Sequence, residues 1–470
     1  MYNQFTDLSR IHFIGVGGAG MSGIAEILID SQAALTVSGC DKARGEATAR
    51  LEKLGVEIHE GHSPDHLDGV DLVVISSAVS EDNPELREAR RRGITVIRRA
   101  EMLGELMRLR YGIAVAGTHG KTTTTSLVGT VLTEAQLDPT VIVGGRLRLL
   151  GTGARLGKSQ YLVAEADEFD RSFLRLTPVI AVITNIDVDH LDTYGNFAAI
   201  QDAFVEFASR APFFGRLIVC LDDPNVQQIL PRVADRRIIT YGFSPQAYLS
   251  AVDLETDGRT SRFGVRLRQD DRLLSRIDLG RIELPMPGRH NVLNALAAVG
   301  VGLSLKIDFD TICRAIQGFG GVHRRFEQVG TWRGAAVVDD YAHHPTEVAA
   351  TLQAARQTFP AGRVLAVFQP HLFSRTRDLA DAFGSSLLGA DLAVVTDVYP
   401  SREAPIPGVT GELVADAARR TGHRHVLYCP SWKEAPALLA EHVQPGDVIV
   451  TLGAGDINRL AQELATEGAA

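Results

Sequence analysis

The sequence predicts an α/β protein built from three domains with mostly parallel sheets. Short, continuously apolar runs recur along the chain, and each is followed by a glycine-containing turn and a helix-like stretch. Continuous rather than alternating apolar runs are typical of strands buried on both faces of a parallel sheet. The chain has 470 residues, which is more than a single hydrophobic core normally serves.

The predicted buried strands are spread over the whole chain. They are Ile11 to Val16, Leu72 to Ile75, Ile113 to Ala116, Val179 to Ile183, Leu217 to Cys220, Val364 to Phe368, Leu392 to Thr396 and Val448 to Leu452. A polar region of alternating character, from Tyr248 to Pro285, instead predicts a β-meander. Composition shifts place the domains at residues 1–108, 109–325 and 326–470, each large enough for its own core.

Composition and charge exclude several classes of protein. The chain is 45% hydrophobic and 22% charged, as expected of a globular protein. Its 48 lysines and arginines against 57 acidic residues give a net charge of −9, which argues against a nucleic-acid partner. Its four cysteines lack the CxxC spacing of zinc sites and fit a reducing compartment. The polar segment Met1 to Arg10 and the lack of a long apolar run predict a cytoplasmic protein without membrane insertion.

A glycine-rich loop near the start of the chain predicts a site for a diphosphate. Gly15, Gly17, Gly18 and Gly20 follow a predicted strand and precede a predicted helix, and Asp41 ends the next apolar stretch. Glycines let backbone N–H groups approach a diphosphate, whose charge the helix N-terminus favours. The spacing fits a dinucleotide or a UDP-sugar equally well, and a tight turn without a ligand is the alternative.

A second loop predicts ATP binding. The loop from Gly117 to Thr123 follows the strand ending at Ala116 and precedes a helix-like run from Ser126 to Leu132. Backbone amides of such a loop hold phosphates, its lysine reaches the terminal phosphoryl group and its hydroxyl binds magnesium. Val115 stands where the usual P-loop has a glycine, so this is a shorter variant. The predicted ATP-binding residues are Gly117, Thr118, His119, Gly120, Lys121, Thr122 and Thr123.

Carboxylates follow two further predicted strands. Glu165, Asp167 and Glu168 follow the strand-like run that ends at Val163, and the segment from Thr184 to His190 closes the next strand. Ligands of open α/β sheets bind at the carboxyl ends of strands, and magnesium prefers oxygen ligands. Helix caps or solvated loop residues are the alternative interpretation of these acids.

Other polar groups are placed where they could contact a nucleotide or a carboxylate. Asn291 and Asn294 share a helix face. They could contact adenine or, in the simpler interpretation, cap the helix. Arg325 lies at the second domain junction. It is a candidate phosphate ligand, because the guanidinium group of arginine matches phosphate geometry. Arg375 and Arg377, predicted to lie in a loop, form a candidate carboxylate clamp.

Taken together, the motifs resemble the Mur ligase family over nearly the whole chain. The matching segments are HFIGVGGAGMSGIA (His12 to Ala25), AGTHGKTT (Ala116 to Thr123), AEADE (Ala164 to Glu168), TNIDVDH (Thr184 to His190), Gly288 to Asn294, VHRRF (Val322 to Phe326), DDYAHHPTE (Asp339 to Glu347) and FQPH (Phe368 to His371). The resemblance implies a Rossmann-like UDP-sugar domain, a central P-loop-type ATPase domain and a C-terminal Rossmann-like α/β domain. It also implies a reaction in which ATP phosphorylates a carboxylate and an amine then attacks the acyl phosphate.

The resemblance also implies residue roles. Lys121, His190, Arg375 and Arg377 would be catalytic. Thr122, Glu165 and His190 would bind Mg²⁺, and Asn291, Asn294, Arg325 and Asp340 would contact ATP. Tyr341 and His343 would lie near the incoming amino acid. Gly15, Gly17, Gly18, Gly20 and Asp41 would bind the UDP-sugar.

Within the family the chain is most similar to the branch that joins L-alanine to UDP-N-acetylmuramate. Several other branches carry a carbamylated lysine near the second metal, whereas this chain has no lysine between Lys158 and Lys306. Cys40 stands where the family more often has serine, and we expect a small effect on UDP-sugar binding. A recycling ligase that attaches a tripeptide, a nicotinamide oxidoreductase and a non-catalytic UDP-sugar binder are the alternatives. The sequence leaves a monomer and a dimer equally open.

Overall fold

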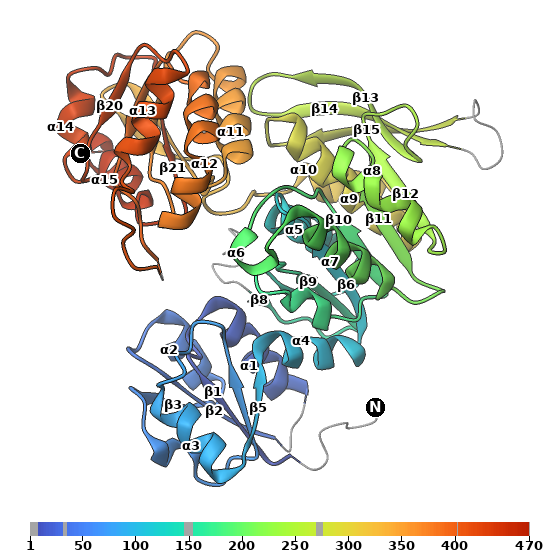
Figure 1. Cartoon of the computed structure of the whole chain (residues 1–470). Coiled ribbons are helices and arrows are strands. Elements are labelled where there is room, and N and C mark those ends of the chain that lie inside the picture. Colours follow the sequence, from blue (N-terminus) through green and yellow to red (C-terminus); the bar gives the residue numbers. More distant parts are fainter. Residues whose placement is uncertain (1–7, 32–34, 145–153, 269–275, 402, 470) are drawn as a thin grey trace. The chain divides into compact units, whose positions relative to one another are not determined.

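The computed structural model describes residues 8–31, 35–144, 154–268, 276–401 and 403–469. Most of the polar N-terminal segment and residues 269–275 of the predicted meander therefore lie outside the described residues. The chain divides into two compact units. One holds residues 1–252, 264–282 and 293–320, and the other holds residues 253–263, 283–292 and 321–470. Figure 1 shows the elements in chain order.

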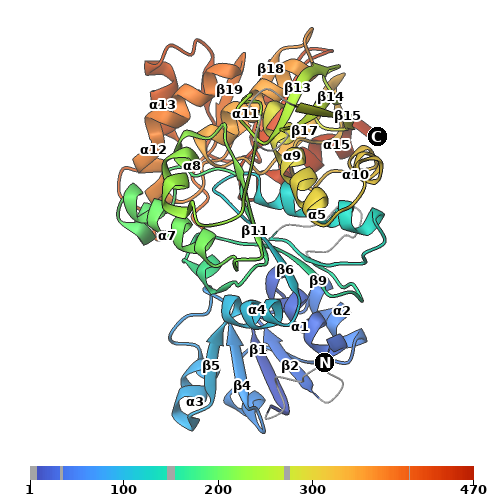
Figure 2. The ribbon, with the colours of Figure 1, turned by 90° about the vertical axis from the view of Figure 1, so that its right-hand side faces the viewer.

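The first sheet is parallel, with strand order β3-β2-β1-β4-β5. Figure 2 shows β2, β1, β4 and β5 of this sheet side by side. Its strands are β1 (Arg10–Ile14), β2 (Thr36–Asp41), β3 (Glu57–Glu60), β4 (Leu72–Ile75) and β5 (Thr95–Arg98). The helices that follow them are α1 (Ala19–Ser31), α2 (Glu46–Lys53), the 3-10 turn η1 (Pro64–Leu67), α3 (Pro84–Arg92) and α4 (Arg99–Arg108). Ile11 and Phe13 of β1 pack in one core cluster and Ile14 packs in another, so helices bury both faces.

The second sheet has ten strands in the order β15-β14-β13-β12-β11-β10-β6-β9-β7-β8. They are β6 (Tyr111–Ala116), β7 (Thr140–Ile142), β8 (Ala154–Arg155), β9 (Tyr161–Glu165), β10 (Ile180–Ile183), β11 (Arg216–Cys220), β12 (Ile238–Gly242), β13 (Leu249–Thr256), β14 (Ser261–Arg268) and β15 (Arg276–Leu284). The six neighbours from β12 to β7 pair in parallel, as the apolar runs predict. The accompanying helices are α5 (Lys121–Glu134), α6 (Leu191–Tyr194), α7 (Phe197–Ser209), α8 (Pro224–Ile229), α9 (Arg289–Ser304) and α10 (Phe309–Gln317), with 3-10 turns at Ser172–Arg175 and Leu230–Val233.

The third sheet has the order β16-β17-β21-β18-β19-β20 and is parallel except for the edge strand β16. Its strands are β16 (Glu327–Trp332), β17 (Ala335–Asp340), β18 (Val364–Phe368), β19 (Leu392–Val395), β20 (Val426–Tyr428) and β21 (Val448–Leu452). Its helices are α11 (Pro345–Thr358), α12 (Phe373–Ser386), α13 (Glu412–Arg420), α14 (Ala435–Ala440) and α15 (Asn458–Ala469), with a 3-10 turn at Leu387–Gly389. Alternate residues of β18 belong to opposite core clusters, which explains its uninterrupted apolar sequence.

Candidate active site

The phosphate loop between β6 and α5 is held in one conformation by the end of the neighbouring strand β10. Gly117 (φ +132°) and Gly120 (φ +80°) adopt backbone angles that side chains disfavour, and α5 begins directly afterwards. The loop is tied down because the Thr184 hydroxyl donates to the His119 carbonyl (2.6 Å) and the His119 N–H donates to Asn185 Oδ1 (2.8 Å). The backbone amides of the loop are therefore pre-organised at a helix N-terminus, as a phosphate site requires.

Lys121 lies in the first turn of α5 and is largely buried. Its Nζ contacts both carboxylate oxygens of Glu168 (2.9 and 2.8 Å) and donates to the carbonyls of Gly117 (2.7 Å) and Thr118 (3.1 Å). Burial alone would lower the pKa of Lys121, but the neighbouring carboxylates, Glu168 foremost, outweigh burial and raise it. The lysine is therefore held as a cation beside the loop.

Thr122 and Glu165 place a hydroxyl and a carboxylate together at the carboxyl end of β9. The Thr122 Oγ1 lies 3.1 Å from each carboxylate oxygen of Glu165, and the Gly144 N–H donates to Glu165 Oε2 (2.7 Å). A hydroxyl beside a carboxylate is an oxygen donor set of the kind that Mg²⁺ prefers. Thr122 and Glu165, two of the three residues that the resemblance implies for Mg²⁺, thus meet in the structure.

His190 sits at the N-terminus of α6 in a left-handed backbone conformation (φ +56°). Its ring meets Phe169 edge-on, with 4.9 Å between centroids, and its Nε2 lies 3.5 Å from Asp189 Oδ2. A non-glycine residue at positive φ is uncommon and often marks a functional position. The role of His190 in metal binding stays a prediction.

Asn294 lies against the phosphate loop from helix α9. Its Oδ1 accepts a hydrogen bond from the Thr124 hydroxyl (3.1 Å), and a Cβ on Gly120 would lie 2.5 Å from the same oxygen. Asn291, one turn earlier, donates from its side-chain amide to the carbonyl of Pro287 (2.7 Å). Both side chains are buried, and the predicted contact with adenine stays a prediction.

In the third sheet, Asp340 ends β17 and is buried. Its carboxylate accepts hydrogen bonds from the N–H groups of Phe326 (2.7 Å) and Ala342 (2.8 Å). Burial raises the pKa of Asp340 to about 6, against the opposing effect of Arg325. Tyr341 follows, with the guanidinium of Arg325 5.3 Å from its ring centroid and the His343 ring 5.3 Å away. The structure thus brings together Asp340, Tyr341 and His343 of the predicted third domain with Arg325 from the end of the predicted second domain.

We expect replacement of Asp340 by asparagine to flatten the pH dependence of stability between pH 4 and 6. Asp340 has a pKa of about 6 in the folded state, above its ordinary value of 3.8. Between these values the folded state binds more protons than the unfolded state, so the contribution is full below the lower pKa and is lost as pH rises through 6. The parent should lose up to about 3 kcal/mol relative to D340N over this window.

Urea unfolding followed by tryptophan fluorescence measures this difference, because both tryptophans, Trp332 and Trp432, belong to the same compact unit as Asp340. Asp378→Asn, at an exposed acid paired with Arg377, is the matched control and should leave the slope unchanged. Parallel pH profiles for the parent and D340N would contradict the assignment.

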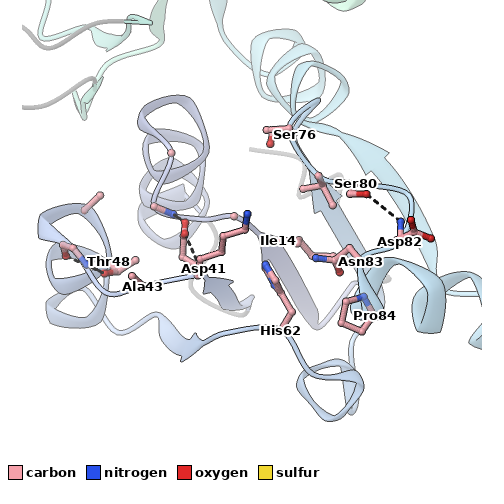
Figure 3. Close-up of a pocket in the computed structure, with 18 of the residues that line it drawn as sticks. Ile14, Asp41, Ala43, Thr48, His62, Ser76, Ser80, Asp82, Asn83 and Pro84 are labelled. Atoms are coloured by element: carbon pink, nitrogen blue, oxygen red, sulfur yellow. Dashed lines mark hydrogen bonds between the residues drawn. The ribbon is translucent and has the colours of Figure 1, made fainter. Parts of the chain in front are cut away.

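The glycine loop of the first sheet lines a cavity of about 890 Å³. Gly15, Gly17, Gly18 and Asp41 contribute to its wall, as Figure 3 shows in part. The Gly17 N–H donates to Asp41 Oδ2 (2.8 Å), so Asp41 holds the loop from the end of β2. Gly20 lies in the first turn of α1, outside this cavity. A cavity of this size beside a glycine loop and a helix N-terminus suits a nucleotide-linked ligand.

Comparison with known proteins settles the family. The chain matches three domain models in sequence: the Mur ligase family catalytic domain (residues 10–111), the Mur ligase middle domain (115–302) and the Mur ligase glutamate ligase domain (324–455). The chain belongs to the Mur ligase family. A UDP-N-acetylmuramate–L-alanine ligase of Salinibacter ruber is 52% identical over 97% of this chain and 94% of its own. One of the same name from Geobacter sp. (strain M21) is 51% identical over 98% of both chains.

Solved structures of Mur ligases agree with the fold. The UDP-N-acetylmuramate–alanine ligase of Thermotoga maritima matches with a TM-score of 0.78 and 29% identity, covering 97% of this chain and 98% of that one. A murein peptide ligase of Psychrobacter arcticus matches with a TM-score of 0.70 and 26% identity, covering 97% and 98%. The predicted α/β fold of three domains is therefore confirmed, while the domain boundaries at residues 108 and 325 stay predictions.

One prediction about the Mur ligase C-terminal domain is wrong. Arg375 and Arg377 lie in helix α12, not in a loop, and positions two apart on a helix do not share a face. Arg375 is buried, whereas Arg377 is exposed and pairs with Asp378 (2.7 Å). The helix starts early because the Ser374 N–H donates to the distant Glu403 (2.9 Å). The two arginines therefore form no common carboxylate clamp.

Sequence reasoning missed several residues that line the cavity in the first sheet. His62 points into it in Figure 3, and Ser76 and Asn83 lie along its wall. Ser76 directly follows β4, so the rule that ligands bind at the carboxyl ends of strands could have found it.

In the described part of the chain, no helix combines the length and apolar character that crossing a membrane requires.

Proposed function

We propose that this Mur ligase joins L-alanine to the carboxylate of UDP-N-acetylmuramate in peptidoglycan precursor synthesis, at the expense of ATP. Relatives about 50% identical over nearly the full length of both chains carry the name of that activity. The observation in the structure that best supports it is the buried Lys121 cation at a pre-organised phosphate loop, which suits phosphoryl transfer. The products are UDP-N-acetylmuramoyl-L-alanine, ADP and phosphate.

The chemistry follows from the poor reactivity of a carboxylate toward amines. Transfer of the γ-phosphoryl group to the carboxylate creates an acyl phosphate, and attack by the amino group of L-alanine then expels phosphate. Lys121 and the loop amides stabilise the negative charge that develops on the transferred group. Thr122 and Glu165 would hold Mg²⁺, with His190 at a second metal. Mg²⁺ neutralises phosphate charge when bound.

The ligand roles of the remaining residues form part of the same proposal. Asn291, Asn294, Arg325 and Asp340 would contact ATP, and Tyr341 and His343 would lie near the amino acid. The glycine loop and Asp41 would bind the UDP-sugar in the cavity of the first sheet, whose lining includes Gly15, Gly17 and Gly18. Arg375 remains a candidate for the acyl group, independently of Arg377.

The deciding experiment measures phosphate release from ATP and Mg²⁺ with UDP-N-acetylmuramate, with and without L-alanine. The proposal expects release that requires both substrates. Release with a tripeptide but not with L-alanine would instead identify a recycling ligase, a function suggested by the likeness to the murein peptide ligase. No release with either amine would overturn the ligase assignment.

We expect His190→Ala to raise the Mg²⁺ concentration needed for half-maximal turnover by about 10-fold, the lower end of what a disturbed metal site costs. Turnover at saturating Mg²⁺ should fall less. His425→Ala, at an exposed histidine next to β20, is the matched control and should leave the titration unchanged. An unchanged Mg²⁺ titration of His190→Ala would remove this residue from the metal site.

A further inference from the structure

The first domain buries a group of polar side chains on the sheet face that α3 covers. Ile14 of β1 and Cys40 of β2 share a core cluster with Leu86 of α3, so this face belongs to α3. His12 lies two residues before Ile14, and side chains two apart in a strand point to the same face. His12 and Glu85 are fully buried, and Cys40 is buried beside them. A buried His–Cys–Glu group in an otherwise apolar layer requires a physical explanation.

Four side chains of this group converge on one point. His12, Cys40, His66 of η1 and Glu85 each offer one ligand atom, and these atoms all lie within 4.8 Å of one another. Cys40 Sγ lies 2.8 Å from Glu85 Oε2, and His66 Nδ1 lies 2.5 Å from Glu85 Oε1. Ligand atoms around a tetrahedral zinc ion are about 3.3 to 3.8 Å apart, given its bond lengths. Small side-chain shifts would thus accommodate an ion.

His12 is oriented as a metal ligand would be. Its Nδ1 bonds the hydroxyl of Ser38 (2.9 Å), which fixes the ring. Its Nε2 is buried, lies 3.8 Å from Glu85 Oε1 and has no hydrogen-bond partner among the described residues. Metal-binding histidines generally have their other ring nitrogen held in this way.

The buried charge of Glu85 also favours a bound cation. Its carboxylate is fully buried, and its ion-pair partners among the described residues are the histidines His12, His62 and His66, with no lysine or arginine. A buried carboxylate requires a compensating positive charge. A divalent cation would supply it, because one carboxylate and one thiolate together neutralise two positive charges.

We propose that His12, Cys40, His66 and Glu85 form a structural site for a divalent transition-metal ion of the zinc class in the first domain. Two imidazoles, a thiolate and a carboxylate are the donor types that zinc selects, whereas Mg²⁺ prefers oxygen ligands throughout. Four protein ligands fill a tetrahedral shell, as in structural rather than catalytic zinc sites. The site is separate from the residues proposed to bind Mg²⁺ and does not depend on the ligase activity.

The competing explanation is a metal-free hydrogen-bond network. In the structure the Cys40 thiol donates to Glu85, and His62 Nδ1 lies 3.2 Å from both Cys40 Sγ and Glu85 Oε2. Burial and the Glu85 charge raise the pKa of Cys40, so this thiol is protonated without metal. Metal binding would form an Sγ–metal bond, break the S–H bond and release one proton to the solvent.

Cobalt(II) titration of the full-length protein, freed of metal by chelation, tests the site. Thiolate-bound cobalt gives a charge-transfer absorption, and we expect it to saturate at one equivalent. Cys40→Ser should abolish this band. Cys220→Ser, at another buried cysteine in β11, should retain it and serves as the matched control. No charge-transfer band in the parent, or an equal band in the Cys40→Ser variant, would overturn the proposal.

Zinc competition against a chromophoric chelator supplies a second measurement. We expect His66→Gln to weaken zinc binding by about 100-fold, because a ligand contributes at least as much as its supporting contacts. Zinc should raise the Tm of the parent and of Cys220→Ser but not that of Cys40→Ser, since binding to the folded state alone stabilises it. Equal zinc affinity of the parent and both ligand variants would overturn the metal site and favour the metal-free hydrogen-bond network.

Discussion

Replacing Lys121 with alanine should reduce ATP-dependent turnover by about 1,000-fold, while affinity for the UDP-sugar stays close to that of the parent. Lys121 is the cation held at the phosphate loop by Glu168, and its charge is the one placed to offset charge on a transferred phosphoryl group. Lys121 does not line the cavity that we assign to the UDP-sugar, so the affinity for the UDP-sugar can be measured independently of the loss of turnover. Phosphate release and equilibrium binding of the UDP-sugar measure the two effects.

The control for Lys121→Ala must separate chemistry from folding, because the substitution leaves Glu168 buried without its partner. Breaking a buried ion pair in this way costs about 3 to 5 kcal/mol. The double variant Lys121→Ala/Glu168→Gln removes that unpaired charge and should recover stability without recovering turnover. Lys158→Ala, at an exposed lysine, should resemble the parent in both measurements. Recovery of turnover in the double variant would show that Lys121 has a structural role only.

The strands of this protein could be predicted because burial on two faces leaves a direct mark on the sequence. The predicted runs Leu72 to Ile75, Val364 to Phe368 and Val448 to Leu452 coincide with β4, β18 and β21. β17 ends in two acidic residues, Asp339 and Asp340, a residue type that is depleted in strands. Asp339 remains in the strand because its carboxylate pairs with Arg324 (3.0 Å) and accepts from Thr451 (2.7 Å). Such long-range partners are not visible in a local pattern.

The same limit explains what could be predicted of the site. The phosphate loop and Glu165 follow strands, so their local sequence indicates their place, and Thr122 and Glu165 do meet. The position of Arg375 depends on Glu403, which lies 29 residues beyond Ser374 and accepts the Ser374 N–H at the start of α12. Likewise, the group of His12, Cys40, His66 and Glu85 is assembled from two strands, a turn and a helix. No single segment contains a recognisable metal motif.

Replacing Gly117 with alanine should reduce turnover by about 100-fold or more, with a matching loss of ATP affinity. At φ +132° the Gly117 backbone lies in a region that is essentially restricted to glycine. An added Cβ would lie 2.0 Å from Thr184 Oγ1 and 3.0 Å from the backbone nitrogen of Asn185, so the loop would have to move. Displacement of a positioning group by about 1 Å can cost 100-fold in rate. Nucleotide binding and phosphate release measure the effect.

Gly93→Ala separates this steric effect from the general cost of a side chain at positive φ. Gly93 has φ +71° at the end of α3, and nothing lies within 4 Å of an added Cβ. We expect this variant to lose about 1 kcal/mol of stability and to keep its turnover. The contrast isolates the contact with Thr184 and Asn185 as the cause. If Gly117→Ala retained turnover within a few-fold of Gly93→Ala, the loop could not be the rigid phosphate cradle that its anchoring to β10 implies.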